Sequence, residues 1–392
     1  MQNDDFYVRL RRKKVIVATH VYGTGASQDL CRYFVEHKAK QVLYIGHPLF
    51  YDAHIKGSGF DLYESGRKIR DHYSVNRPIP LFVSYLLHII KTIVWSCRAG
   101  YTWDLYVGSN NLNAFAGLLL RTFGRVKKVV YYVIDFNPKR YDAPLVNALY
   151  HRLDQYCVRH ADETWNMSPR METGRKKYFG FTGGNQKVVP VGLWLSESVS
   201  LPITEIHRYT LAFVGHVQEK QGIQYVMQSI PYIVKKIPDF KFLVIGGGDY
   251  LSVLQKLSTD LKVSEHVKFT GYVKNHADIE KLLAQSALAV ALYDRYDGKK
   301  LSFSYFGNPT KVKAYLSAGL PVIMSDVPYN AKEIERVGCG KIVSYESRDI
   351  ASAIIEILVN EKTLLSYRAH VVSYRKKFDW NRIFGAALAN LP

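Results

Sequence analysis

Short apolar, β-branched runs alternate with longer helical patterns along the whole chain. In the first half, strand-like runs cover residues 14–19, 41–45, 105–107, 129–134, 163–166 and 188–191, and helical patterns cover 28–36, 112–122, 144–159 and 169–178. In the second half, strand-like runs cover residues 211–214, 242–245, 267–269, 288–292, 321–324 and 341–343. Continuous apolar strands are covered on both faces, and repeated βα order joins parallel strands. The pattern therefore predicts an α/β fold built on doubly wound parallel sheets.

The pattern restarts near Leu211 after a polar stretch, residues 196–208, which we interpret as a linker. A chain of 392 residues is long enough for two domains of ordinary size. We predict one Rossmann-like domain at 1–200 and a second at 201–392, whose last helix is a candidate to pack back on the first. Ligands of such sheets bind beyond the carboxyl ends of the strands, so we expect the site in a cleft between the domains.

The net charge of +19 is uneven, with 28 Lys and Arg against 16 Asp and Glu in residues 1–200 and 25 against 18 in residues 201–392. Such a surface attracts nucleic acid, anionic lipid or phosphorylated ligands. No helix-turn-helix, zinc or base-stacking motif accompanies the charge, so we predict no nucleic-acid partner. The four cysteines are scattered without metal-ligand spacing, which is typical of reduced thiols in a cytosolic protein.

The segment 79–96 is strongly apolar, but Ser84, His88 and Lys91 recur on one helical face. It is shorter than the roughly 20 apolar residues that span a bilayer. The alternatives are a core helix with a wet edge and an interfacial helix in the headgroup layer. Nearby basic residues favour the interfacial helix, because anionic headgroups attract them. The predicted membrane contacts are Leu86, Ile89 and Ile93.

The segment 307–323, GNPTKVKAYLSAGLPVI, indicates a loop, a helix and a buried strand. Asn308 suits the N-cap and Pro309 the first helical position. Lys311 then falls in the first turn, where the helix dipole disfavours a cation. Such a lysine is either a solvated surface residue or the partner of an anion, such as a phosphate, at the helix start.

Several motifs follow one another in the second half: LAFVGHVQEKQGI (211–223), FLVIGGGDY (242–250), VKFTGYV (267–273), LAVALYDRYDG (288–298) and the segment 307–323. Together they resemble the nucleotide-sugar-binding domain of GT-B-fold glycosyltransferases. In the first half, VVYYVIDFNPKR (129–140), ADETWNMSPRM (161–171) and KVVPVGLW (187–194) resemble later strands of the same fold. The similarity extends to the membrane-associated glucuronosyltransferase of xanthan assembly and related group 1-like enzymes. It implies a GT-B fold and transfer from a nucleotide sugar.

The resemblance also implies a donor site. Lys311 occupies the place of a lysine that grips the donor diphosphate, Tyr293 that of a donor-site tyrosine, and the Tyr272–Val273 backbone would approach a uracil. The helix start and the glycine loop add further donor-binding candidates: Gly215, His216, Val217, Asn308 and Thr310.

The sequence departs from the retaining branch of the fold at two places. That branch carries two glutamates eight positions apart, where this chain has Phe306 and Ala314. It usually carries Arg and Lys after the first glycine strand, where this chain has His216 and Gln221. These losses argue against a standard retaining enzyme.

Asp135 closes the apolar run 129–134 and occupies the place of the aspartate that serves as base in the resembled enzymes. Its position alone also fits a cap or loop-stabilising aspartate. His20, Gly23 and Gly25 form the candidate acceptor side, because glycines allow close backbone approach. Taken alone, His20 fits a hydrogen-bonded histidine better than an acceptor ligand. A dinucleotide site is disfavoured, because Gln28 replaces the third glycine of its fingerprint.

We therefore predict transfer of a sugar from a UDP-type donor to a lipid-linked saccharide or polysaccharide precursor, inverting, with Asp135 as base. The rivals are a retaining enzyme of the same fold and a non-catalytic sugar-nucleotide or lipid-binding protein. The sequence has no metal-ligand cluster, so we expect no metal and no cofactor, the UDP-sugar being a substrate. We expect a cytoplasmic protein, peripheral on the inner face of the cell membrane at anionic lipid.

Overall fold

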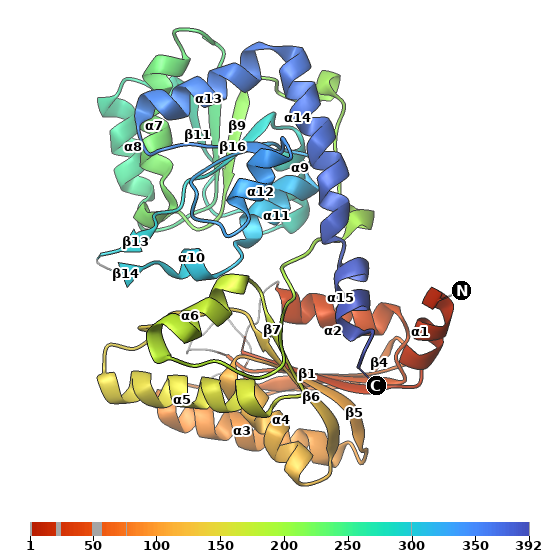
Figure 1. Cartoon of the computed structure of the whole chain (residues 1–392). Coiled ribbons are helices and arrows are strands. Elements are labelled where there is room, and N and C mark those ends of the chain that lie inside the picture. The colour runs from red at the N-terminus through yellow and green to blue at the C-terminus, as the bar shows by residue number, and fades with distance from the viewer. Residues whose placement is uncertain (1, 21–24, 49–56, 76, 299, 392) are drawn as a thin grey trace. The chain divides into compact units, whose positions relative to one another are not determined.

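The computed structural model describes residues 2–20, 25–48, 57–75, 77–298 and 300–391 (Figure 1). The chain divides into two compact units, Met1–Pro190 with Trp380–Pro392 and Val191–Asp379. The sequence pattern placed the first boundary at residue 200, whereas the structure has it between Pro190 and Val191. The last helix, α15 (Trp380–Leu388), lies in unit 1 and packs against α2 (Ala26–Glu36).

Within the described residues, unit 1 contains an eight-stranded sheet in the order β4-β3-β2-β1-β5-β6-β7-β8. Its strands are β1 (Lys14–Thr19), β2 (Gln41–Gly46), β3 (Gly59–Glu64), β4 (Arg67–Tyr73), β5 (Trp103–Ser109), β6 (Val126–Val133), β7 (Glu163–Asn166) and β8 (Gln186–Val188). The six strands β2, β1, β5, β6, β7 and β8 pair in parallel, as predicted. The strands β3 and β4 add an antiparallel hairpin at the β2 edge. The sequence pattern missed this hairpin because β4 is exposed at six of its seven positions and so lacks an apolar face.

The helices of unit 1 are α1 (Gln2–Leu10), α2, α3 (Leu81–Arg98), α4 (Asn111–Thr122), α5 (Pro144–His160), α6 (Pro169–Phe179) and α15. Helices α3, α4 and α5 lie together on one face of the sheet, and α2 and α15 lie on the other (Figure 1).

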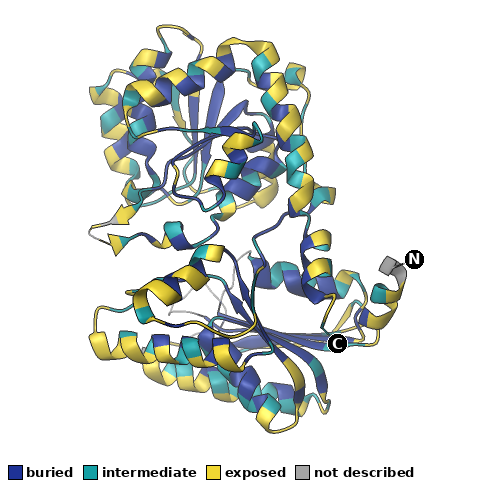
Figure 2. Ribbon diagram, viewed as in Figure 1, coloured by how far each residue is buried: buried dark blue, intermediate teal, exposed yellow. Residues whose placement is uncertain are grey.

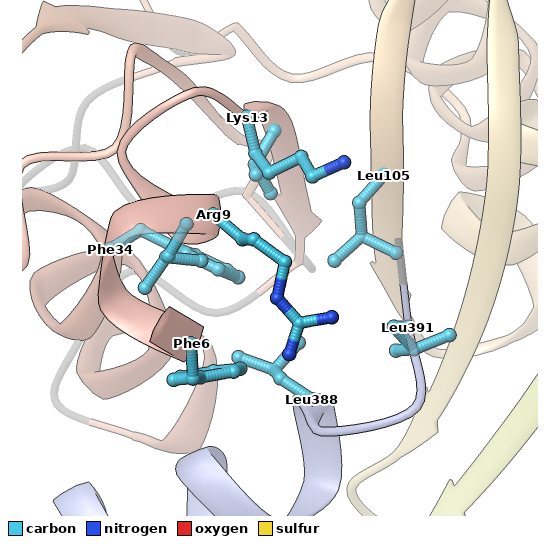
Figure 3. A pocket seen from close by; sticks show the side chains of 9 residues that line it. Phe6, Arg9, Lys13, Phe34, Leu105, Leu388 and Leu391 are labelled. Carbon is cyan, nitrogen blue, oxygen red and sulfur yellow. The ribbon is translucent and has the colours of Figure 1, made fainter. Parts of the chain in front are cut away.

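The chain's C-terminal residues close unit 1 near the start of β1. Leu388 and Leu391 line a small recess with α1, α2 and β5 (Figure 3). Its volume of about 20 Å³ holds roughly one water molecule, so it is too small for a substrate.

In unit 2 the described residues form a parallel six-stranded sheet in the order β11-β10-β9-β12-β15-β16. Its strands are β9 (Thr210–Val214), β10 (Lys241–Ile245), β11 (Val267–Phe269), β12 (Leu288–Ala291), β15 (Val322–Met324) and β16 (Gly340–Ile342). A two-stranded ribbon, β13 (Tyr296–Asp297) and β14 (Lys300–Leu301), follows β12. The helices are α7 (Ile223–Ile233), α8 (Leu251–Asp260), α9 (His276–Ala284), α10 (Phe303–Phe306), α11 (Thr310–Ser317), α12 (Ala331–Arg336), α13 (Ser347–Val359) and α14 (Glu361–Tyr374).

In both sheets the central strands β1, β2, β12 and β15 are buried almost throughout, with Lys14 at the start of β1 half-buried (Figure 2). Each sheet also has a switch point, where the chain turns from building one side to building the other: β1 and β5 in unit 1, β9 and β12 in unit 2. Crevices beyond the carboxyl ends of such strands are where doubly wound sheets bind ligands.

Candidate functional site

The carboxyl ends of β9 and β10 in unit 2 are joined to glycine loops that press against each other. A side chain at Gly246 would place its Cβ 2.0 Å from the carbonyl oxygen of Gly215, and one at Gly248 would lie 2.3 Å from that of Val217. Both glycines also have positive φ angles. Close packing of the two loops therefore explains these glycines without a ligand.

Lys311 packs against the loop that follows β9, at Gly215. A Cβ at Gly215 would be 3.4 Å from both Cε and Nζ of Lys311. The ammonium is 4.0 Å from the Phe213 ring centre and 5.0 Å from that of Tyr293, and it donates a hydrogen bond of 2.5 Å to Gln221 Oε1. Burial lowers the pKa of Lys311 to about 7. The structure thus places a cation at the switch point of unit 2, in apolar and aromatic surroundings.

The start of α11 differs by one position from the prediction. The helix begins at Thr310 with Pro309 as its N-cap, so the predicted cap at Asn308 is wrong. Proline at 309 is extended, with ψ of 121°, which delays the helix. Asn308 is buried, and its Nδ2 has no hydrogen-bond partner. Lys311 still falls in the first turn, as predicted.

The other predicted donor-site residues divide into exposed and buried ones. His216 and Thr310 are exposed, Val273 is half-buried, and Tyr272 is 83% exposed beside the turn after β11. Val217 is buried, and its N–H already donates to the carbonyl of Gly247, so it is not free to hold a phosphate. Tyr293 is also buried and contacts Lys311 with its ring. Tyr293 therefore packs against the Lys311 ammonium and does not line an open site.

Lys313, two residues further along α11, is buried over the Phe378 ring, and its Nζ has no hydrogen-bond partner. The two lysines are two residues apart on a helix, so they point to opposite sides. Burial lowers the pKa of Lys313 well below its ordinary value. Lys313 packs in the core, and Lys311 is the lysine of α11 that faces the glycine loop.

In unit 1, His20 follows β1 at the switch point and belongs to a buried histidine network. Its Nδ1 accepts from the amides of Asn110 (2.9 Å) and Asn113 (2.8 Å), so its Nε2 donates to Nδ1 of His88 on α3 (3.0 Å). The ring of His47, which follows β2, stacks on His88. Burial lowers the pKa of His20 to about 3 and of His88 to about 4. These rings are therefore neutral near pH 7, and His20 is held by protein groups.

Asp135 follows β6 at the same edge of the sheet. Its Oδ2 accepts a 2.5 Å hydrogen bond from Arg140, whose charge also acts on His20. Tyr85 of α3 lies with its ring 6.1 Å from that of His20 and its hydroxyl 3.4 Å from the hydroxyl of Tyr141. The structure thus gathers Asp135, Arg140 and the histidine network at one edge of unit 1. The sequence pattern did not single out Arg140 or His47, whose contacts arise only in the folded chain.

The glycines of the predicted acceptor loop are only partly described. Gly23 lies outside the described residues. Gly25 precedes α2 with φ of 171°, an extended conformation that any residue adopts, so its backbone shape requires no glycine.

Helix α3 spans Leu81–Arg98. Unlike an ordinary surface helix, it has its polar face toward the protein and an apolar face toward solvent. Its polar residues face inward: His88 contacts His20, and Thr92 contacts His47. An apolar stripe faces outward, with Phe82, Leu86 and Ile90 exposed by 73%, 47% and 55%. Of the predicted contact residues, Leu86 is exposed, whereas Ile89 and Ile93 are only half-buried, because they flank the stripe.

Two further observations concern membranes and metals. No helix among the described residues is both long and apolar enough to cross a membrane. The described part of the chain also contains no group of three or more His, Cys, Asp or Glu side chains that could hold a metal ion.

Comparison with solved structures defines the fold. Sucrose-phosphate synthase from Thermosynechococcus elongatus superposes with a TM-score of 0.71 at 14% identity, covering 97% of this chain and 99% of that chain. Anabaena Alr3699/HepE in complex with UDP gives a TM-score of 0.67 at 14% identity, covering 100% and 96%. The protein has the GT-B fold of these glycosyltransferases.

Sequence comparison finds a family match within the second unit. Residues 208–360 match the family model described as "Glycosyl transferases group 1". A phosphatidyl-myo-inositol mannosyltransferase of Mycolicibacterium smegmatis is 25% identical over 204 residues, 51% of this chain and 50% of the relative. The chain thus spans about half the length of this curated relative. Because the relative is a mannosyltransferase, the narrower resemblance to a xanthan-type glucuronosyltransferase stays a prediction.

Proposed function

We propose that this protein is a glycosyltransferase that moves a hexosyl group from a UDP-type nucleotide sugar to a lipid-linked saccharide or polysaccharide precursor. The observation that carries the proposal is Lys311, a cation at the switch point of the unit whose sequence matches the group 1 family. An ammonium among aromatic rings and a tight glycine loop suits the diphosphate of the donor, because charged hydrogen bonds strengthen where water is excluded. The similar structure of Anabaena Alr3699/HepE is a complex with UDP, which supports this choice of donor.

On the acceptor side, we propose that Asp135 accepts the proton of the attacking hydroxyl. The oxygen then bonds to the anomeric carbon, and the bond from that carbon to the diphosphate breaks, its electron pair leaving with UDP. Arg140 orients the carboxylate through the hydrogen bond to Oδ2. The reaction inverts the anomeric centre, and the absence of carboxylates at Phe306 and Ala314 supports this choice over the retaining alternative.

A panel of nucleotide sugars tests the proposal, with thermal unfolding as the readout, since a ligand of the folded state raises its stability by mass action. We expect UDP and a UDP-sugar to raise the melting temperature more than GDP, ADP or free sugars. Determining the anomeric configuration of the product then separates inversion from retention. A protein that binds no nucleotide sugar would refute the proposal, and one that binds but never turns over a donor would be the non-catalytic alternative.

We also propose that the protein docks on the inner face of the cell membrane through α3 and α5. The exposed stripe on α3 is joined by Leu145, Val146 and Leu149, exposed in the first turns of α5. Both helices pack against α4, and Tyr85 of α3 contacts Tyr141, which lies in the loop just before α5. Arg70 of β4 stacks over Phe60 beside α3, which adds positive charge for anionic headgroups. A lipid-linked acceptor at this surface would lie next to Asp135.

Replacing Phe82, Leu86 and Ile90 together with serine is expected to reduce binding to anionic liposomes at least tenfold. The variant loses three of the exposed apolar side chains that would enter the headgroup layer, at roughly 25 cal/mol per Å² of apolar area. Co-sedimentation with vesicles of mixed neutral and anionic lipid measures the effect. The matched control replaces three exposed residues of unit 2, Val253, Val359 and Leu365, with serine. Equal sedimentation of both triple variants and the unchanged protein would end the docking proposal.

A further inference from the structure

The hydrogen bond between Lys311 and Gln221 joins two parts of unit 2 that are far apart in sequence. Gln221 closes η3 (Glu219–Gln221), the short turn between β9 and α7, whereas Lys311 lies at the start of α11. In the family pattern described above, position 221 usually holds a lysine. In this chain Gln221 occupies that position, and its amide oxygen accepts a hydrogen bond from the ammonium of Lys311.

Both partners stand on rigid supports. Gly222 has φ of +70°, and a Cβ there would lie 2.0 Å from the carbonyl oxygen of Leu292, so the turn is pressed onto the end of β12. On α11, Tyr315 follows Lys311 by one helical turn. Its hydroxyl accepts from the N–H of Val214 and donates to the carbonyl of Val290, both at 3.0 Å. The distance between positions 221 and 311 is therefore set by the sheet.

An amide suits a partner that must orient the ammonium and leave its charge available. Gln221 Oε1 takes one of the three N–H groups of Lys311, and two remain for an anion. A carboxylate at 221 would neutralise the cation, and an alkyl side chain would leave it unoriented. Neither the Phe213 nor the Tyr293 ring carries a charge, so both contact the ammonium without competing for the phosphate.

We propose that Gln221 is the positioning residue for Lys311 and that positions 221 and 311 form an exchangeable pair. In this protein the cation that binds the donor diphosphate is Lys311 on α11. A lysine at position 221, on the turn after β9, would bind the same diphosphate. The proposal rests on the proposed function, since it assigns a role within the donor site.

Four variants test the exchange, with calorimetric titration of UDP as the readout. Lys311→Gln is expected to weaken UDP binding tenfold or more, because a charged hydrogen bond to a phosphate is lost. The double variant Gln221→Lys/Lys311→Gln is expected to bind within about threefold of the unchanged protein, since the amide and the ammonium trade places. Gln221→Met, of similar length but without the acceptor, is expected to weaken binding roughly three- to tenfold. Lys220→Gln, a control at the neighbouring lysine, should leave the affinity within about twofold.

The pH dependence supplies a readout that a purely structural role would not change. Because the pKa of Lys311 is lowered to about 7, the free protein loses this charge as the pH rises. A bound diphosphate favours the charged form, so UDP affinity should be highest below pH 7 and fall towards tenfold per unit above it. In Lys311→Gln this decline between pH 7 and 8.5 should disappear.

These experiments distinguish failure of the proposed UDP binding from failure of the exchange between positions 221 and 311. If the unchanged protein binds no UDP and no nucleotide sugar, the proposed function and the exchange both fall. If the unchanged protein binds UDP and Lys311→Gln does not, a double variant as weak as Lys311→Gln would overturn the exchange alone. Recovery of binding in the double variant would establish it.

Discussion

Replacing Asp135 with asparagine is expected to lower turnover of the nucleotide sugar by about 10²–10⁴-fold, the range for loss of a general base. Asparagine keeps an oxygen acceptor for the guanidinium of Arg140, so the loop after β6 should hold its shape. Donor binding should therefore stay within about threefold, because the donor site proposed at Lys311 belongs to the other unit. Release of UDP in steady state, together with calorimetric UDP binding, measures both quantities.

The matched control for this variant is Asp142→Asn, which removes a carboxylate from the same loop. Asp142 is 98% exposed and pairs only loosely with Lys139, at 3.6 Å. Its replacement should leave turnover nearly unchanged. Turnover of Asp135→Asn close to that of the control would remove Asp135 as the base and favour the retaining alternative.

The second large effect concerns stability. Asp154→Ala is expected to destabilise unit 1 by about 3–5 kcal/mol, because it leaves Arg175 buried without its charge partner. The pair is bidentate and almost wholly buried, with Nε to Oδ2 at 2.7 Å and Nη2 to Oδ1 at 3.0 Å. Tyr131 donates to the same carboxylate at 2.7 Å. The network joins β6, α5 and α6, and Asp135 lies two residues after the end of β6.

Urea unfolding measures this loss. At an m-value of about 2 kcal/mol/M, the midpoint for unit 1 should fall by roughly 1.5–2.5 M. Adding UDP should shift the transition of unit 2 and so distinguish the two. The double variant Asp154→Leu/Arg175→Met should recover part of the loss, since the unpaired charge is gone. Asp5→Ala, which breaks an exposed pair with Arg9, should change stability by less than about 1 kcal/mol. An Asp154→Ala midpoint equal to that of Asp5→Ala would contradict this account of the pair.

The pattern of apolar residues predicted most of the strands, including the observed bounds of β1, β7 and β11. β1 and β7 lie inside their sheet and are buried almost throughout, so their sequences carry a strong signal, whereas β11 is a partly exposed edge strand. The edge strand β4 carries none, because its charged residues are exposed. Asp135 and Gly215 were also located correctly, because each directly follows a predicted strand, β6 or β9. Residues that follow parallel strands lie at the carboxyl edge of the sheet.

Contacts between distant residues lay beyond sequence reasoning. Residue identity alone gave no sign that Gln221 would meet Lys311, that the N–H of Val217 would bond to Gly247, or that Tyr293 would be buried beneath the ammonium. The polar face of α3 was identified from the sequence, and the outward apolar stripe fits the interfacial alternative, whereas the inward contacts of the polar residues were not predicted. A helix with histidine and threonine on one face usually turns them to solvent, and here the histidine network at the end of β1 draws them inward.

The central claim is that a diphosphate binds at Lys311, beneath the glycine loop that follows β9. The most direct test is a crystal structure of the protein with UDP, in which the distance from Lys311 Nζ to the nearest phosphate oxygen is measured. We predict about 2.7–2.9 Å, the length of a charged hydrogen bond, with Gln221 still in contact with the same ammonium. UDP bound elsewhere, with Lys311 beyond hydrogen-bond reach of any phosphate oxygen, would contradict the account.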